Sequence, residues 1–347
     1  MQISKYVKTE HRHVCKVIDA QDWPEDEKKD IKRKVLFVLK RDGRINYNAF
    51  EQGFRWNLCS EKLKSGDYTN WDGWEFRSNW AMTFRWGTEI QSPIPKWDGL
   101  PCDHIVILGE QGIGDEILFM SALPDLMVRV GTKCLEFQTY PRLRSIIERS
   151  FRIKTTDRRL LSHVTEGKAL VALGDLFPWY RRDKRHFPRK PFLKADPEKV
   201  EHWRNWLTQF GDEKKIGIAW YTRKGYVEPE SLMTDKGVYF DLQYRDAEKQ
   251  IETAIAGVNQ VPFDTTDDFE NLFAFVKALD QVNTVTQTLC HVAGSQGTRC
   301  KAVIPPNNGE VKFFLWNYGD PNPVCESPIY PNMTVYRGID EFRKADT

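Results

Sequence analysis

Short apolar segments alternate with amphipathic segments through most of the chain after residue 100. The first apolar segment, residues 104–108, is followed by glycines and acidic residues and then by an amphipathic stretch at residues 117–130. This order predicts a strand, a tight turn and the start of a helix. The same alternation predicts further strands at residues 133–139 and 169–173 and helices at residues 141–150 and 197–210.

The pattern restarts near residue 215. Apolar runs predict strands at residues 216–220, 259–262, 282–285 and 300–304, and helical spacing predicts helices at residues 246–256 and 267–279 and a short helix around His291. Two consecutive alternating halves predict an α/β protein with two Rossmann-like domains facing a cleft. Ligands of such domains bind beyond the carboxyl ends of the strands.

The first hundred residues have a different character. Residues 48–63 carry apolar side chains at helical spacing, and Gly66 ends that pattern before the aromatic segment at residues 71–76. The segment resembles one helix-turn-helix unit of a tetratricopeptide array, and a single unit cannot form a solenoid alone, so we expect it to cap the next domain. The predicted boundaries are a helical, TPR-like cap and connector at residues 1–98, a first half at 99–211 and a second half at 212–347.

Composition narrows the class of protein. The 347 residues are 40% hydrophobic and 13% aromatic, which suits a globular protein, and the net charge of +2 is too small for a general binder of polyanions. Seven scattered cysteines without a C-x-x-C pair predict free thiols. Because no run approaches about 20 apolar residues and residues 1–10 lack a signal-peptide core, we expect a cytoplasmic protein without a membrane span.

Residues 109–116 carry the strongest local pattern, with three glycines in six residues. Glycine allows positive φ and close backbone approach, and the N-terminus of the following helix favours negative charge. Gly112 and Gly114 are therefore expected to shape the turn, and Asp115 is either a simple helix-terminal charge or a functional carboxylate. The string lacks both the P-loop ending and the Gly-x-Gly-x-x-Gly spacing, which disfavours kinases and dehydrogenases.

Several segments, in order, resemble the glycosyltransferase domain that follows tetratricopeptide repeats in many bacterial proteins, a relative of the ADP-heptose heptosyltransferases. The matching segments are residues 95–99, 109–116, 217–220, 286–294 and 327–331. The resemblance implies a GT-B-like fold in which residues 99–211 hold the acceptor and residues 212–347 hold a nucleotide sugar, with no other cofactor. The acceptor is left open between a saccharide, a protein and modified DNA, and the oligomeric state is left open too.

Asp115 matches the aspartate that is regarded as the catalytic base in the heptosyltransferase branch. Inverting sugar transfer needs a base for the acceptor proton and groups that stabilise the departing diphosphate. A helix N-terminus lowers the pKa of a carboxylate and weakens it as a base, so a structural role for Asp115 stays open. Glu110 and Glu116 are the alternative bases.

The donor site is expected where a strand ends and a short helix begins. Thr286, Gln287 and Thr288 offer side chains and free amides that suit a diphosphate, although the family usually has an Asp-Thr pair in this segment. The resemblance gives His291 a charge-assisted hydrogen bond to a phosphate, and the alternative is an ordinary core histidine.

Further cations and acidic residues join this prediction. Arg223 and Lys224 follow the first strand of the second half and would neutralise the leaving group, or they are exposed loop cations. Lys236 is a weaker candidate. Asp267, Asp268 and Glu270 open a predicted helix and are expected to cap it, with a ribose contact as the alternative.

No essential metal is expected. The chain has no Asp-x-Asp pair after a predicted strand, as a metal-dependent sugar transferase would need. His11 and His13 lie near the N-terminus and are expected to be solvated rather than ligands.

Residues 179–190 pack six cations and three aromatic residues into twelve positions. Cations can follow phosphates and aromatic rings can stack on bases, so this loop could bring modified DNA to the enzyme, with the target base taken out of the stack. The alternatives are a site for an anionic lipid-linked or phosphorylated saccharide and a solvated loop. The candidate acceptor residues are Arg181, Arg182, Lys184 and Arg185.

A hypothesis of another class is a non-catalytic, GT-B-like binding module, because a fold does not determine a function. The altered pair at Thr286 and Gln287 favours this alternative. Asp115, His291 and the cationic loop favour catalysis. The sequence therefore predicts a metal-independent, inverting glycosyltransferase that uses a nucleotide sugar.

Overall fold

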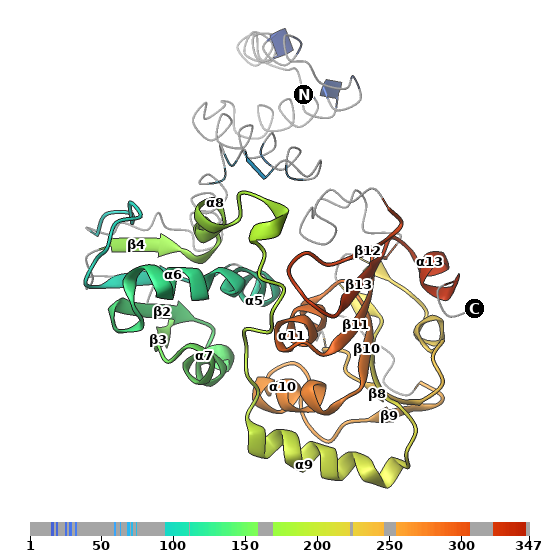
Figure 1. Cartoon of the computed structure of the whole chain (residues 1–347). Coiled ribbons are helices and arrows are strands. Elements are labelled where there is room, and N and C mark those ends of the chain that lie inside the picture. Colours follow the sequence, from blue (N-terminus) through green and yellow to red (C-terminus); the bar gives the residue numbers. More distant parts are fainter. Residues whose placement is uncertain are drawn as a thin grey trace, which may run out of the picture.

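The structure is a computed structural model of the chain, drawn in Figure 1. It describes scattered positions between residues 15 and 74 and then residues 94–110, 112–158, 169–222, 225–245, 255–305 and 322–344. Most of the predicted cap, His11 and His13, and residues 246–254 of the helix predicted at residues 246–256 lie outside the described residues. Within the described ranges, no helix combines the length and the apolar character needed to cross a bilayer.

The N-terminal half contains a parallel sheet in the order β3-β2-β1-β4. Its central strand β1 consists of four buried apolar residues, as expected when helices cover both faces of a parallel sheet. Figure 1 shows this half on the left. Its elements are β1 (Ile105–Leu108), α5 (Ile113–Phe119), α6 (Leu123–Val130), β2 (Leu135–Thr139), α7 (Arg144–Phe151), β3 (Lys154–Asp157), β4 (Ala169–Ala172) and α8 (Leu176–Tyr180).

The C-terminal half contains a larger sheet, on the right of Figure 1, in the order β12-β13-β11-β10-β5-β8-β9. All its pairings are parallel except that of β12 with β13. The strands are β5 (Lys215–Ala219), β8 (Val238–Asp241), β9 (Val258–Gln260), β10 (Gln281–Val285), β11 (Arg299–Val303), β12 (Val324–Glu326) and β13 (Met333–Tyr336). The helices are α9 (Pro197–Leu207), α10 (Phe269–Ala278), α11 (Thr288–Gln296) and α13 (Ile339–Lys344), and β6 (Tyr221–Thr222) and β7 (Gly225–Tyr226) form a small ribbon.

Both sheets have the strand order of a Rossmann fold. Along the chain, the parallel strands of the C-terminal sheet follow the order 3-2-1-4-5-6, and the N-terminal sheet repeats its first four positions. The order reverses between β1 and β4 in one sheet and between β5 and β10 in the other, and ligands of such sheets bind beyond the carboxyl ends of the strands at that point. The predicted α/β class with two parallel sheets is confirmed, and it fits a GT-B-like fold.

Helix α9 departs from the expectation that it closes the N-terminal half. It packs against α10 of the C-terminal half, as Figure 1 shows. Trp203 meets Phe275 at 5.3 Å between ring centroids, and Trp206 lies 6.0 Å from Phe240. These rings extend the apolar core of the second sheet, because edge-to-face aromatic contacts add to the area they bury.

Aromatic residues of the N-terminal segment enter the core of the first half. Trp74 is 1% exposed, and its indole N–H donates to the carbonyl oxygen of Gly174 at 2.9 Å. Its ring meets Phe119 of α5 at 5.9 Å, and Tyr68 meets Phe187 at 5.8 Å. These described residues therefore cover the N-terminal half, although the TPR-like character of the segment stays a prediction.

Candidate functional site

The turn after β1 is held by a buried carboxylate. Glu116 is fully buried, and one of its oxygens accepts a hydrogen bond from the Glu110 amide at 2.9 Å, while the other accepts one from the Thr139 hydroxyl. Burial raises its pKa to about 7, against the opposing effects of Thr139 and of Arg158 at 3.6 Å. A Cβ on Gly109 would lie 2.3 Å from this carboxylate, which explains the glycine there.

Glu110, the other alternative base, connects the turn to β4. Its Oε1 accepts a hydrogen bond from the amide of Gly174 at 2.8 Å, and the residue is 5% exposed. The side chain thus spans the point where the order of the first sheet reverses. Glu110 and Glu116 are buried and hold the turn, whereas Asp115 is half-buried.

The glycines of the turn provide space rather than unusual dihedral angles. Gly109, Gly112 and Gly114 all lack the positive φ that the sequence suggested. Gly112 precedes α5 with φ −103° and ψ 141°, and a Cβ on it would lie 3.1 Å from Oδ2 of Asp115. The carboxylate of Asp115 therefore folds back over the start of its own helix.

Helices α5 and α11 bring the two halves together beside these turns, as Figure 1 shows in the centre of the molecule. A Cβ on Gly114 would lie 2.8 Å from Cδ2 and 3.3 Å from Nε2 of His291. The same position is 3.5 Å from the hydroxyl oxygen of Thr288. The glycine before Asp115 thus lies against two of the predicted donor-site residues, at the switch points of both sheets.

His291 is a buried imidazole that lies beside Tyr330. It is 4% exposed, and its Nδ1 lies 2.7 Å from the hydroxyl oxygen of Tyr330. Burial lowers its pKa to about 3, so the ring carries no charge at neutral pH. A hydrogen bond from this neutral ring to an anionic phosphate would still be charge-assisted, because the acceptor is ionised, so the expected role of His291 stays a prediction.

Some polar groups at the start of α11 lack hydrogen bonds to the described residues. The hydroxyl oxygen of Thr286 is buried without a hydrogen-bonding partner among the described residues. Gln287 precedes the helix in an extended conformation, and its side chain makes no capping hydrogen bond. Helix N-termini carry free N–H groups and a partial positive charge, so this segment can accept an anionic ligand.

Two of the predicted cations cannot be placed, and a third lies elsewhere. Arg223 and Lys224 fall outside the described residues, between the strands of the β6/β7 ribbon that follows β5. Lys236 precedes β8 and so lies at the amino edge of the sheet, opposite the carboxyl edge where Thr286 is found. The weaker prediction for Lys236 is therefore wrong.

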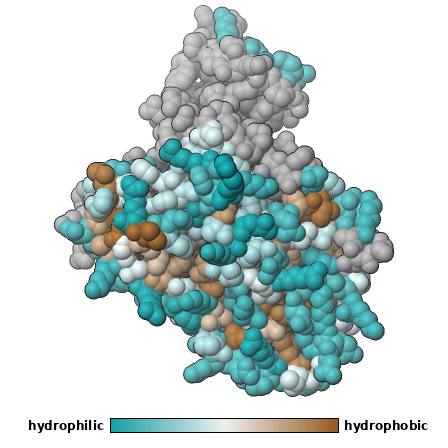
Figure 2. Space-filling model, in the orientation of Figure 1, coloured by the Kyte–Doolittle hydropathy of each residue, from teal (hydrophilic) through white to brown (hydrophobic). Residues whose placement is uncertain are grey.

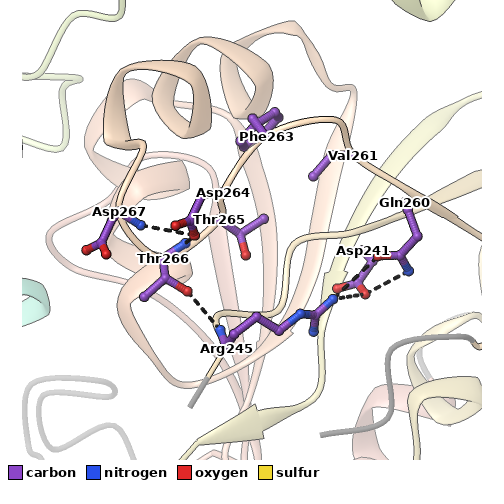
Figure 3. Close-up of a pocket in the computed structure, with 9 residues that line it drawn as sticks. All are labelled: Asp241, Arg245, Gln260, Val261, Phe263, Asp264, Thr265, Thr266 and Asp267. Atoms are coloured by element: carbon purple, nitrogen blue, oxygen red, sulfur yellow. Dashed lines mark hydrogen bonds and ion pairs between the residues drawn. The ribbon is translucent and has the colours of Figure 1, made fainter. Parts of the chain in front are cut away.

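A pocket of about 540 Å³ opens at the carboxyl ends of β8 and β9. Figure 3 shows Arg245 crossing it to meet Asp241, with Nη2 2.6 Å from Oδ2. The other terminal nitrogen of Arg245 is buried without a partner among the described residues. The lining residues are Asp241, Arg245, Gln260, Val261, Phe263, Asp264, Thr265, Thr266 and Asp267. Nothing in the residue pattern singled out Asp241 or Arg245.

The acidic start of α10 has two roles. Asp268 caps the helix, since its Oδ1 accepts a hydrogen bond from the Asn271 amide at 3.0 Å, which confirms the capping prediction for this residue. Asp267 instead pairs with Arg142 at 2.8 Å, and Glu270 pairs with Arg149 at 2.8 Å. Both arginines come from the N-terminal half, so these ion pairs join the halves beside the pocket.

The basic loop is only partly available to a ligand. Arg181 is fully buried, and its Nη2 donates to the carbonyl oxygen of Ser121 at 2.6 Å and to Asp125 at 2.9 Å. Its proposed contact with an acceptor is therefore wrong. Arg185 is paired with Asp183 at 2.8 Å, and Phe187 is 4% exposed.

The remaining members of that loop lie at the surface. Arg182 and Lys184 are exposed, and Trp179 is 41% exposed. Figure 2 shows hydrophilic side chains over the segment that follows α8. The cations and aromatic rings that alternate in the sequence thus lie apart in the structure, because Arg181 and Phe187 are buried in the first half.

Comparison with known proteins gives distant relatives. No protein-family model matches the chain. Protein FlbA of Caulobacter vibrioides is 28% identical over 264 residues, which cover 65% of this chain and 44% of that protein, so the match spans less than half of the relative's length.

Two solved structures are similar to the chain at low sequence identity. The chain is similar to ADP-heptose LPS heptosyltransferase II of E. coli, with 14% identity, a TM-score of 0.44, and coverage of 67% of this chain and 90% of that one. It is also similar to a family 9 glycosyl transferase from Veillonella parvula, with 14% identity, a TM-score of 0.47, and coverage of 69% and 88%. A heptosyltransferase and a family 9 glycosyl transferase are thus among the solved structures to which the chain is similar.

Proposed function

We propose that this chain is an inverting glycosyltransferase that moves a sugar from a nucleotide sugar to an acceptor. One observation carries the proposal: Gly114 at the start of α5 lies against His291 and Thr288 of α11. Each helix follows the strand at the switch point of its own sheet. Because ligands of Rossmann-like sheets bind at that edge, one ligand at this junction would touch both halves.

The start of α11 is the proposed site for the donor diphosphate. Thr286 supplies a buried hydroxyl that lacks a partner among the described residues, and Gln287 leaves the first amides of the helix uncapped. These groups are donors in fixed positions, which is what a departing diphosphate needs. The pocket beside Asp241 and Arg245, at the same edge of the same sheet, is the proposed site for the nucleoside.

In the proposed reaction, Asp115 removes the proton of the acceptor hydroxyl as its oxygen attacks the anomeric carbon. The bond from that carbon to the diphosphate breaks, and the leaving group takes up negative charge at α11. His291 offers a hydrogen bond from its neutral ring there, and the helix dipole adds to it. No metal is assigned to this step, and loss or retention of activity in EDTA tests that assignment.

The experiment is a thermal shift in EDTA with the diphosphates of adenosine, guanosine, uridine, cytidine and thymidine. One class should raise the melting temperature, because a ligand that binds only the folded state stabilises it. Thr288→Ala should weaken the shift, whereas Ser295→Ala, at the other end of α11, should leave it unchanged. Absence of any shift would contradict the donor site and favour a binding module without nucleotide chemistry.

A further inference from the structure

Tyr330 is held rigidly behind His291. It is 1% exposed, and its ring lies so close to Gly294 of α11 that a Cβ there would come within 2.4 Å of the ring. Phe192 stacks on it at 6.2 Å with an angle of 20° between the rings. The hydroxyl of Ser327 accepts a hydrogen bond from the Tyr330 amide at 3.1 Å. The position of the phenol is therefore determined by packing and by the backbone.

The hydroxyl oxygen of Tyr330 lies 2.7 Å from Nδ1 of His291. Among the described residues, this nitrogen is the hydrogen-bonding partner of the hydroxyl. A neutral imidazole has one nitrogen that donates and one that accepts. If Nδ1 carried the proton, the phenolic hydrogen would be buried without an acceptor, which costs free energy. The arrangement that satisfies both groups has Tyr330 as the donor and Nδ1 as the acceptor.

The charge states of both groups agree with this assignment. Burial raises the pKa of Tyr330 well above its usual value, and nearby Cys290 and Asp115 raise it further, so the residue remains a phenol. Burial lowers the pKa of His291 to about 3, so the ring carries a single proton.

We propose that Tyr330 is a positioning residue that holds His291 in the tautomer with its proton on Nε2. That nitrogen faces the start of α5, because it lies 3.3 Å from the position of a Cβ on Gly114. The protonated nitrogen therefore lies at the junction of the two halves. Its use as a donor to the diphosphate rests on the proposed function, whereas the tautomer itself does not.

Nitrogen-15 NMR of the imidazoles reads the tautomer directly at neutral pH. His291→Asn identifies the signals of this ring among those of the seven histidines. The wild-type protein should show a protonated Nε2 and an unprotonated Nδ1. Tyr330→Phe, which keeps the ring and removes the hydroxyl, should raise the population protonated on Nδ1. Tyr336→Phe, at a buried tyrosine of β13, should leave the spectrum of His291 unchanged.

A wild-type ring protonated on Nδ1, or one that Tyr330→Phe leaves unaltered, would overturn the inference. A second measurement separates it from the proposed function. Where a nucleoside diphosphate binds, Tyr330→Phe should weaken its affinity about tenfold, the effect of roughly one hydrogen bond to a charged group. If no nucleotide binds while the tautomer responds as expected, the proposed function fails and the role of Tyr330 stands.

Discussion

Gly114 of α5 lies against His291 of α11, so closely that a methyl group on Gly114 would come within 2.8 Å of the imidazole carbon Cδ2. Real Cβ atoms do not approach other atoms at this distance, so either the helices or the ring would have to move. This contact joins the catalytic candidate Asp115 to the proposed donor site. The glycine is therefore a condition for the two halves to meet as they do.

Gly114→Ala should lower the rate of sugar transfer about a hundredfold, because a displacement of about 1 Å at a reacting centre can cost that much. It should also lower the free energy of unfolding by about 1–3 kcal/mol through overpacking. Transfer rates and urea unfolding would measure the two effects. Gly338→Ala is the matched control, since an added Cβ there meets nothing within 4 Å. Equal activity in both variants would contradict the proposed geometry.

Asp115→Asn should lower the transfer rate by about 100-fold or more, the usual contribution of a general base, and leave nucleotide affinity within about twofold. The amide has nearly the same shape and cannot accept the acceptor proton. Transfer kinetics and calorimetric titration with the nucleoside diphosphate would show the separation. Transfer at the wild-type rate would remove Asp115 from the mechanism and leave it as a helix-terminal charge.

Much of the architecture was predictable, because buried strands and buried helix faces appear in the sequence as patterns of apolar residues. Strand β1 lies inside a parallel sheet and all four of its residues are apolar, and the glycines of residues 109–116 indicate a turn between strand and helix. Strand β10 is equally buried but has only two valines among its five residues. Strand β8 was missed, because its four residues lie in a segment without clear alternation. Strands β12 and β13 were missed as well, because their three and four residues are too few for a clear alternation.

The site was predictable only in part, since its chemistry depends on contacts between distant segments. Asp115 and His291 were found from local motifs, but the neutral state of His291 comes from burial, which the motif does not report. Nothing in the sequence pattern singled out Arg142 and Arg149, which form ion pairs with the acidic start of α10. The burial of Arg181 also depends on contacts with a distant segment, so the sequence indicated only a cation in a loop.

Arg181→Met should lower the free energy of unfolding by about 2 kcal/mol, because it removes a buried hydrogen bond to the carbonyl oxygen of Ser121 and an ion pair with the partly exposed Asp125. The neighbouring Arg182→Met should change it by less than about 0.5 kcal/mol, as is usual for an exposed side chain. Urea unfolding of the two variants tests the difference. If both were equally stable and only Arg181→Met lost acceptor binding, Arg181 would belong to the acceptor site after all.

Glu116 should make the protein less stable as the pH rises. Burial raises its pKa in the folded state to about 7, above the ordinary value of 4.5. Between these values the unfolded chain has lost this proton and the folded protein keeps it, so the free energy of unfolding falls as pH increases from about 4.5 to 7. The shift corresponds to about 3 kcal/mol. Glu116→Gln lacks this titration and keeps an acceptor for the amide of Glu110.

The difference in stability between wild type and Glu116→Gln should therefore change with pH. Urea unfolding of both proteins from about pH 5 to about pH 8 would measure this change. The free energy of unfolding of the variant should rise relative to that of the wild type as the pH rises, because only the wild type has to ionise a buried carboxyl group. Other titrating groups are common to the two proteins and cancel in the difference. A difference that stays constant over this range would show that Glu116 is already ionised at pH 5, with Arg158 and the hydrogen bonds of the turn compensating for its burial.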